Sequence, residues 1–330
     1  MRICCGVLTL CAALALAGPR AALAGGAPTK IPGAGPTGAL AFHPEYGLFT
    51  EDADGSYVLF APVPGKGRPG VEPYSRRDDR GCLHDKAVNA LVLSPDFKWA
   101  ASGDNGGNVL VWDVLHSLGN PHKREDAKKL GPHGRAVSCL AFSPDGKRLA
   151  SGGLDDTCRL WDLAGGQALG VCDGIAGGVG AVAFSADGKT LYAAGRNGKL
   201  HVLDGATAKE TGRVETAAGE ALALSPGGAW LAIGTAERKL ALVATAGKDR
   251  KEIDPGQLVT AVAFSPDGAT LAAALKDGSV RLYDTPTAGA AGKLEGGPVA
   301  PTALAFSPDA ATLASAGDSV CVWSVTLGGK

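Results

Sequence analysis

The sequence is poor in aromatic residues, in excess charge and in long hydrophobic runs. Phe, Trp and Tyr make up 5% of its 330 residues, and its single methionine is the first residue. Thirty-three acidic residues nearly balance 32 basic ones, which leaves a formal net charge of −1. That balance argues against a nucleic-acid partner held by phosphate attraction. After residue 24 no apolar run approaches the roughly 18 residues of a membrane helix, so we expect no membrane span in the mature chain.

The first 24 residues are typical of an export signal. Arg2 provides the positive start, and an apolar run of about fifteen residues from Ile3 to Ala17 follows it. Alanines on both sides of Leu23 then form a cleavage motif. We therefore expect residues 1–24 to be a signal peptide and the protein to be periplasmic or extracellular. A cut after Ala17 and a retained, uncleaved anchor are the alternatives.

Metal and catalytic motifs are scarce. Of eight cysteines, three lie in the signal, and none of the other five forms a C-x-x-C pair. The six histidines do not cluster, and there is no G-x-S-x-G or H-E-x-x-H motif. We therefore expect no catalytic residue, no metal ligand and no cofactor, and most cysteines to be small buried side chains.

One cysteine pair has a sharper alternative. Cys158 and Cys172 lie at equal distances from Gly165, so a hairpin centred there places them opposite each other. Export permits oxidation, and the pair is therefore a possible disulfide.

The strongest signal is an internal repeat. Turns of the Ser-Pro-Asp-Gly type begin at Ser94, Ser143, Ser185, Ser225, Ser265 and Ser307, with a degenerate copy at His43-Pro44-Glu45. Successive serines are 49, 42, 40, 40 and 42 positions apart, and the degenerate copy precedes the first of them by 51. This spacing indicates seven units of about forty residues, each one supersecondary unit.

Every unit has the same order of strands and turns. An alternating apolar segment, such as 137–142, precedes the proline-containing turn. A second apolar run leads to a polar Asp-Gly or Asn-Gly turn, which tight hairpins favour, and a third run ends at an anchor such as Trp161-Asp162. A weaker fourth segment, such as 167–172, leads to the next unit. With no helical periodicity, this pattern predicts an all-β, seven-bladed β-propeller of four-stranded antiparallel blades.

These units resemble the repeats of WD40-repeat proteins over essentially the whole chain after the signal. The best copy is residues 131–163. In that family a buried chain of hydrogen bonds joins Trp, Ser, His and Asp, and the resemblance assigns this tetrad to His133, Ser151, Asp155 and Trp161. Such buried polar groups each need a partner. The preceding unit keeps a partial tetrad of His84, Ser102 and Trp112, with Gly106 at the position of the aspartate.

The resemblance also implies a function. WD40 propellers are mainly rigid platforms for protein–protein contact, so we expect a non-catalytic, monomeric scaffold with one or more protein partners. The face expected to bind them carries the turns between second and third strands, with Asp104, Asn105, Leu154, Arg196, Asn197, Glu237, Arg238, Lys276 and Asp277. Ordinary exposed turns are the simpler interpretation of these residues. The alternative function is a propeller enzyme or small-ligand binder that acts in the central channel.

The ends of the repeat region predict how the ring closes. The last unit stops after its third strand, and residues 27–31 are the spare segment before the first copy. We expect this segment to pair beside 318–325 and to close the last blade with an N-terminal strand, within one domain of residues 25–330. Insertions at 61–83 and 115–131 carry mixed charges, and they are either solvated loops or partner-binding excursions.

Overall fold

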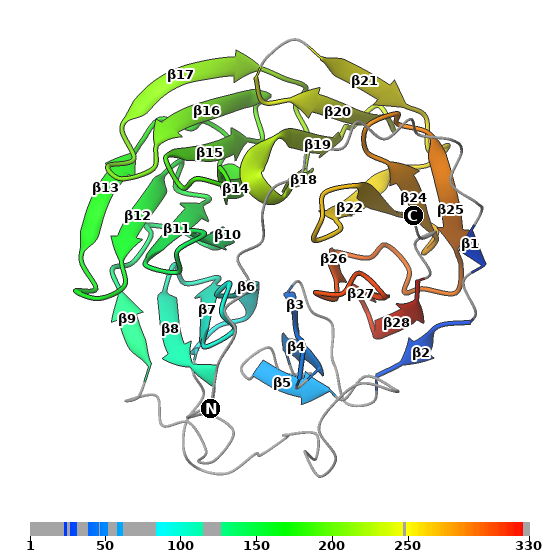
Figure 1. The fold of residues 1–330 in the computed structure, drawn as a ribbon, viewed down its shortest axis with the longest axis horizontal. Helices are drawn as coiled ribbons and strands as arrows, with labels where there is room; N and C mark the ends of the chain where they lie inside the picture. Colours follow the sequence, from blue (N-terminus) through cyan, green and yellow to red (C-terminus); the bar gives the residue numbers. More distant parts are fainter. Residues whose placement is uncertain are drawn as a thin grey trace, which may run out of the picture.

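The chain folds into a ring of β-sheets around a central axis (Figure 1). The computed structural model describes residues 23–24, 27–31, 39–45, 47–51, 58–61, 84–114, 127–246 and 249–325. Most of the predicted signal peptide and most of both predicted insertions lie outside these ranges. No helix in the described ranges is long and apolar enough to span a membrane.

Five blades follow one another along the chain, and each has four antiparallel strands in sequence order from the axis outward (Figure 1). Their strands are β6 (Val88–Leu93), β7 (Trp99–Asp104), β8 (Val109–Asp113) and β9 (Lys128–Leu130); β10 (Val137–Phe142), β11 (Arg148–Gly153), β12 (Cys158–Asp162) and β13 (Ala168–Cys172); β14 (Val179–Phe184), β15 (Thr190–Gly195), β16 (Lys199–Asp204) and β17 (Glu210–Glu215); β18 (Ala221–Leu224), β19 (Trp230–Gly234), β20 (Leu240–Ala244) and β21 (Arg250–Ile253); β22 (Val259–Phe264), β23 (Thr270–Leu275), β24 (Val280–Asp284) and β25 (Ala290–Leu294). A short 3₁₀ helix, η2 (Pro226–Gly228), occupies the turn between β18 and β19.

A sixth four-stranded blade is built from both ends of the chain. Its strands are β26 (Ala303–Phe306), β27 (Thr312–Ala316), β28 (Val320–Ser324) and β2 (Thr29–Lys30). Thr29 lies opposite Val322 in antiparallel register, and the Ile31 N–H donates to the Val320 carbonyl at 2.9 Å. The N-terminal segment therefore pairs with the last repeat as the sequence predicted. A two-residue strand further upstream, β1 (Leu23–Ala24), pairs in parallel with β25.

The first repeat differs from the prediction of seven four-stranded blades. Its described residues form a sheet of three strands, β3 (Leu40–His43), β4 (Gly47–Glu51) and β5 (Val58–Ala61). Six blades with four antiparallel strands are observed among the described residues, so the predicted count of seven is not confirmed. The chain after Ala61 enters residues 62–83, which lie outside the described residues.

Each hydrophobic core cluster is shared by two neighbouring sheets. One cluster joins Phe42 and Leu48 of the three-stranded sheet to Val322 of the last blade. Another joins Phe49, on the opposite face of the same sheet, to Trp112 of the β6–β9 blade. The inner strand β3 also contacts both β6 and β26. Both faces of this sheet are therefore covered, as stacking of repeats requires.

The repeated turn is held by a buried serine. The Ser143 hydroxyl donates to Asp145 Oδ1 at 2.5 Å and accepts from the Arg148 N–H at 2.9 Å, while Asp145 also accepts from the Lys147 N–H at 3.1 Å. The fourth residue of the turn has a left-handed backbone, with φ = 67° at Gly146 and φ = 57° at Ala310 of the last copy. Because alanine has a Cβ, this conformation is strained at Ala310.

We predict opposite effects for two substitutions at this turn position. Ala310→Gly should stabilise the protein by about 0.5–1 kcal/mol, because glycine adopts positive φ without a steric penalty. Gly146→Ala should destabilise it by about 1 kcal/mol, since a Cβ there would meet no atom within 4 Å and only the backbone strain changes. Urea unfolding of both variants checks the pair, and equal signs would contradict the strain argument.

Candidate functional site

One face of the ring carries the turns between second and third strands, and backbone hydrogen bonds hold these turns on two sides. Within a blade, the Leu154 N–H donates to the Ala136 carbonyl at 2.8 Å, and the same bond joins Arg196 to Gly178 at 3.1 Å. Between blades, the His133 N–H donates to the Gly107 carbonyl at 2.8 Å. Each bonded turn is therefore fixed to the loop that enters its own blade or the next one. We call this face, with its bonded turns at Gly107, Leu154 and Arg196, the braced rim.

The predicted partner-binding residues divide into three groups. Asn105, Leu154 and Arg196 line the mouth of the axial cavity. Exposed turns around the rim carry Asn197, Glu237, Arg238, Lys276 and Asp277. Asp104 is fully buried, so its assignment to a binding surface was wrong.

The axial cavity has a volume of about 440 Å³ and is lined by the inner strands. The strand register shifts near the start of four inner strands, β6, β10, β14 and β22. Each of these four shifts is a β-bulge. Bulges redirect a side chain, and the bulged positions of three of these strands carry Asn89, Ser138 and Thr260, all in the cavity wall. Sequence reasoning missed this polar ring. Its signal was a polar residue directly after the buried Val at the start of three of the four strands; the fourth has Gly180.

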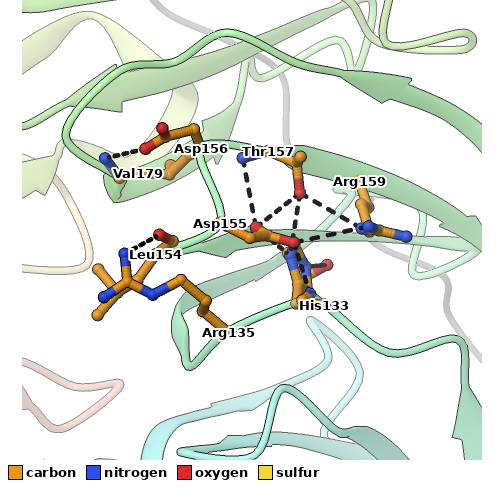
Figure 2. Close-up of polar contacts among 12 residues, drawn as sticks. His133, Arg135, Leu154, Asp155, Asp156, Thr157, Arg159 and Val179 are labelled. Carbon is orange, nitrogen blue, oxygen red and sulfur yellow. Dashed lines mark hydrogen bonds and ion pairs between the residues drawn. The ribbon is translucent and has the colours of Figure 1, made fainter.

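One sector of the rim carries the ion pair of Arg196 with Glu220 and the exposed side chain of Arg135. Arg196 pairs with Glu220, and its side chain is 29% exposed while that of Glu220 is 81% exposed. The exposed Arg135 donates from Nη1 to the Leu154 carbonyl at 3.1 Å (Figure 2). Arg135 and Glu220 were not among the residues singled out from the sequence, because their loops match no repeat motif.

The four residues of the predicted tetrad come together in the β10–β13 blade. Trp161 Nε1 donates to Ser151 Oγ at 2.9 Å, and Ser151 Oγ lies 2.7 Å from His133 Nε2. His133 Nδ1 lies 2.9 Å from Asp155 Oδ1 (Figure 2). With the proton on Nδ1, every donor in this chain meets an acceptor. Thr157 joins the network, since its Oγ1 donates to Asp155 at 2.8 Å and lies 3.1 Å from His133 Nδ1.

The partial tetrad of the preceding blade is more complete than its sequence indicated. His84 Nε2 lies 2.5 Å from Ser102 Oγ, and Trp112 is buried as expected. The expected gap at Gly106 is filled by Asp104, whose Oδ2 lies 2.9 Å from His84 Nδ1. Asp104 Oδ1 also accepts the N–H groups of Gly106 and Asn108, both at 2.8 Å.

The geometry of the neighbouring blade explains this exchange. Gly153 stands in the β10–β13 blade where Asp104 stands in the β6–β9 blade. A Cβ placed on Gly153 would lie 2.4 Å from both His133 Nδ1 and Asp155 Oδ1. A side chain at that position therefore already points at the histidine, and an aspartate can serve it from either position. The two solutions exclude each other sterically.

Burial and hydrogen bonding shift the ionisable groups of these networks. Burial lowers the pKa of His133 and is only partly offset by Asp155, which favours the neutral ring. Burial alone would raise the pKa of Asp155, but hydrogen bonds from His133, the Gly134 N–H and Thr157 outweigh it and lower the pKa to about 2. Burial likewise opposes ionisation of Asp104, whose pKa is lowered by hydrogen bonds from Asn108 and His84.

The cysteine prediction is right about the strand register and wrong about the disulfide. Cys158 and Cys172 lie directly opposite each other on β12 and β13, as the hairpin symmetry required. Both are free thiols, so the disulfide is not formed. A cross-strand pair is marginal for a disulfide, because its Cβ separation of about 4.5–5.5 Å exceeds the usual bonding distance.

We predict unequal costs for removing the two tetrad aspartates. Asp104→Ala should destabilise the protein by about 3 kcal/mol, because it leaves buried backbone and side-chain donors unsatisfied. Asp155→Ala should cost about 1–2 kcal/mol, since Asp155 is partly exposed and Thr157 remains beside His133. Urea unfolding measures both, with the exposed Asp173→Ala as a control that changes stability by less than about 0.5 kcal/mol. A larger loss for Asp155→Ala would contradict this order.

The low pKa of Asp155 predicts a pH-dependent contribution to stability. The folded-state pKa of about 2 lies below the unfolded-state value, which is about 3.9, so ionised Asp155 stabilises the fold fully above about pH 5. That contribution falls as the pH drops toward the folded-state pKa. The stability difference between the wild type and Asp155→Asn should therefore shrink between about pH 5 and pH 3 in urea unfolding. A difference that is constant over this range would show that Asp155 is not stabilised as an anion.

The repeats match a known family. The model of the WD domain, G-beta repeat, matches residues 82–113, 125–162, 166–204 and 253–284. A comparison with curated proteins finds no match. The segments 125–162 and 166–204 each run from the outer strand of one blade to the third strand of the next, so the sequence repeat and the blade are offset by one strand. This offset explains why the last blade takes its outer strand from the N-terminal segment. From the four matched repeats and the ring of blades together, the chain is a β-propeller that contains WD40 repeats.

Proposed function

We propose that this protein is an exported, non-catalytic scaffold that binds a protein partner through the braced rim. WD40 propellers generally mediate protein interactions, which makes a binding platform the starting expectation for the fold. The observation that carries the proposal is the rim itself. Its turns are fixed by backbone hydrogen bonds within and between blades, so the side chains they carry are held in place before a partner arrives. Such pre-organisation lowers the ordering cost of binding.

The proposed contact surface is the sector where three consecutive blades meet the axial cavity. It contains Asn105, Leu154 and Arg196 at the cavity mouth, with Arg135 and Glu220 beside them. The sector combines an aliphatic group with two arginines and an exposed carboxylate. Arg is favoured in interfaces, while the absence of Trp and Tyr from these five positions points to modest affinity. A partner of matching mixed charge fits this chemistry.

The cavity supports a non-catalytic role. Among its described lining residues, the ionisable side chains are Cys139, Arg196 and Glu220. Burial raises the pKa of the Cys139 thiol to about 12, so it remains protonated and is a poor nucleophile. Glu220 is paired with Arg196 and largely exposed, which does not favour a general base.

A propeller enzyme or small-ligand binder that acts in the axial cavity is the second candidate function. The cavity volume of about 440 Å³ and the ring of Asn89, Ser138 and Thr260 favour it. A panel of hydrolase substrates, with and without added divalent metal, separates this candidate from the scaffold. Turnover that depends on the purified chain would favour the enzyme over the platform.

The proposal includes three structural expectations. The three-stranded sheet is the seventh blade, supported by its coverage on both faces. The propeller is monomeric. Export removes residues 1–24, and β1 leaves with them, so β25 becomes an outer strand like β13 or β17.

We predict that charge reversal on the rim removes partner binding. Proximity labelling in the native host would use the full chain, the rim variant Arg135→Glu/Arg196→Glu, and the control Lys147→Glu/Lys189→Glu. The control changes the net charge equally, but its lysines are exposed on turns at the opposite ends of the strands. Partners labelled by the wild type and the control should be lost with the rim variant, and the measured Kd should rise at least tenfold, or about 1.4 kcal/mol.

Two results would contradict the scaffold. Equal labelling by all three proteins would place any binding surface elsewhere, and no labelling above background would argue against a protein partner. The mature N-terminus, read by mass spectrometry from the exported fraction, tests localisation separately. Gly25 is the expected first residue of the mature chain.

A further inference from the structure

A cysteine, a histidine and a glutamate from two neighbouring blades meet between β13, β16 and β17. Cys172 ends β13, the outer strand of one blade, while His201 lies in β16 and Glu210 begins β17 of the next. One potential ligand atom from each side chain lies within 4.8 Å of the other two. The sequence expectation of no metal ligand rested on the dispersed histidines. Here the fold places a single histidine beside two ligands of other types.

His201 is the unusual member of this group. Its side chain is 1% exposed, and neither ring nitrogen has a hydrogen-bond partner among the described residues. Nδ1 lies 3.2 Å from Glu210 Oε1, which is close but lacks hydrogen-bond geometry. A buried polar group without a partner costs about 1–3 kcal/mol. Burial lowers the pKa of His201, and a neutral imidazole nitrogen is the form of histidine that binds a metal ion.

The repeat does not require these residue types. The position of Cys172 opposite the third strand is filled by Leu130, Ile253 and Leu294 in other blades. The position of Glu210 is filled by Ala168, Ala290 or Arg250. The fold therefore requires neither a cysteine at the first position nor a glutamate at the second. Among the described residues, the Cys–His–Glu group occurs at this pair of blades.

The distances suit a tetrahedral zinc ion. Zinc binds sulfur at about 2.3 Å and nitrogen or oxygen at about 2.0–2.2 Å, so its ligand atoms lie about 3.3–3.6 Å from one another. The separation of 3.2 Å between His201 Nδ1 and Glu210 Oε1 is close to the shortest edge of such a tetrahedron. The others require small side-chain movements within the 4.8 Å group.

Arg213 completes the surroundings. Its Nη2 donates to Glu210 Oε2 at 2.7 Å, and its Nε donates to Oε1. Carboxylates that bind metals are commonly held by such an outer hydrogen bond, which orients them. A thiolate and a carboxylate together balance the charge of a divalent cation, and Arg213 leaves one positive charge beside the site.

We propose that Cys172, His201 and Glu210 bind one Zn²⁺ ion, with water as the fourth ligand. The ion joins the outer edge of the β10–β13 blade to the β14–β17 blade, at a position where two neighbouring blades otherwise meet through side-chain packing. Binding requires a free Cys172. Oxidation to a disulfide with Cys158, which lies directly opposite, excludes the metal.

Metal titration of the reduced, EDTA-treated full chain tests the site. We expect one equivalent of Zn²⁺ to bind and to raise the Tm, because the ion binds only the folded site. Co²⁺ should produce the visible absorption of a tetrahedral ion together with a thiolate charge-transfer band. Cys172→Ser should remove the charge-transfer band, and Glu210→Gln should weaken Zn²⁺ binding at least tenfold.

Matched controls separate this site from adventitious metal. Cys321→Ser changes another buried cysteine, and Glu215→Gln changes an exposed glutamate on the same strand as Glu210; both should bind Zn²⁺ like the wild type. Glu210 is itself at the edge of the site, with a side chain 24% exposed, so its variant should fold even if Cys172→Ser does not. Absence of stoichiometric binding, or equal binding by Glu210→Gln and Glu215→Gln, would overturn the proposal.

Discussion

A blade of this protein has two apolar faces and cannot bury either of them alone. Every core cluster is therefore shared by adjacent sheets, and the fold is stable only when each sheet has a neighbour on both sides. This constraint explains the closure of the ring. Without β2, the last blade would have three strands and an open edge at β28. The short N-terminal strand thus completes the blade that the C-terminal repeat forms.

The same burial creates a second requirement, because turns and loops bring polar groups into the interior. Buried serines satisfy the repeated turn, and the histidine networks satisfy the junction between a blade and its entering loop. The β6–β9 and β10–β13 blades meet this requirement with aspartates at different positions, Asp104 and Asp155. Hydrogen-bonding capacity, rather than residue position, is what the structure preserves.

Local rules made much of the fold predictable. Alternation, turn chemistry and repeat spacing placed the strands, and the missing outer strand of the last unit indicated its N-terminal replacement. Alignment of equivalent repeat positions predicted the wrong role for Asp104, because the direction of a side chain depends on the strand and turn that carry it. The group of Cys172, His201 and Glu210 was invisible for another reason. Its members belong to different strands of two blades, and no spacing in one dimension reports that proximity.

Two blades of the proposed contact sector contain the buried histidine networks. These networks lie in the blades that carry the turns of Asn105 and Leu154, and the next turn, that of Arg196, is bonded to its own entering loop. In three other blades Leu203, Val243 and Tyr283 stand at the position of Trp161, while the last blade keeps Trp323. A surface that binds by pre-organisation should lie where the scaffold resists local opening. The polar networks therefore connect stability to the location of the proposed binding surface.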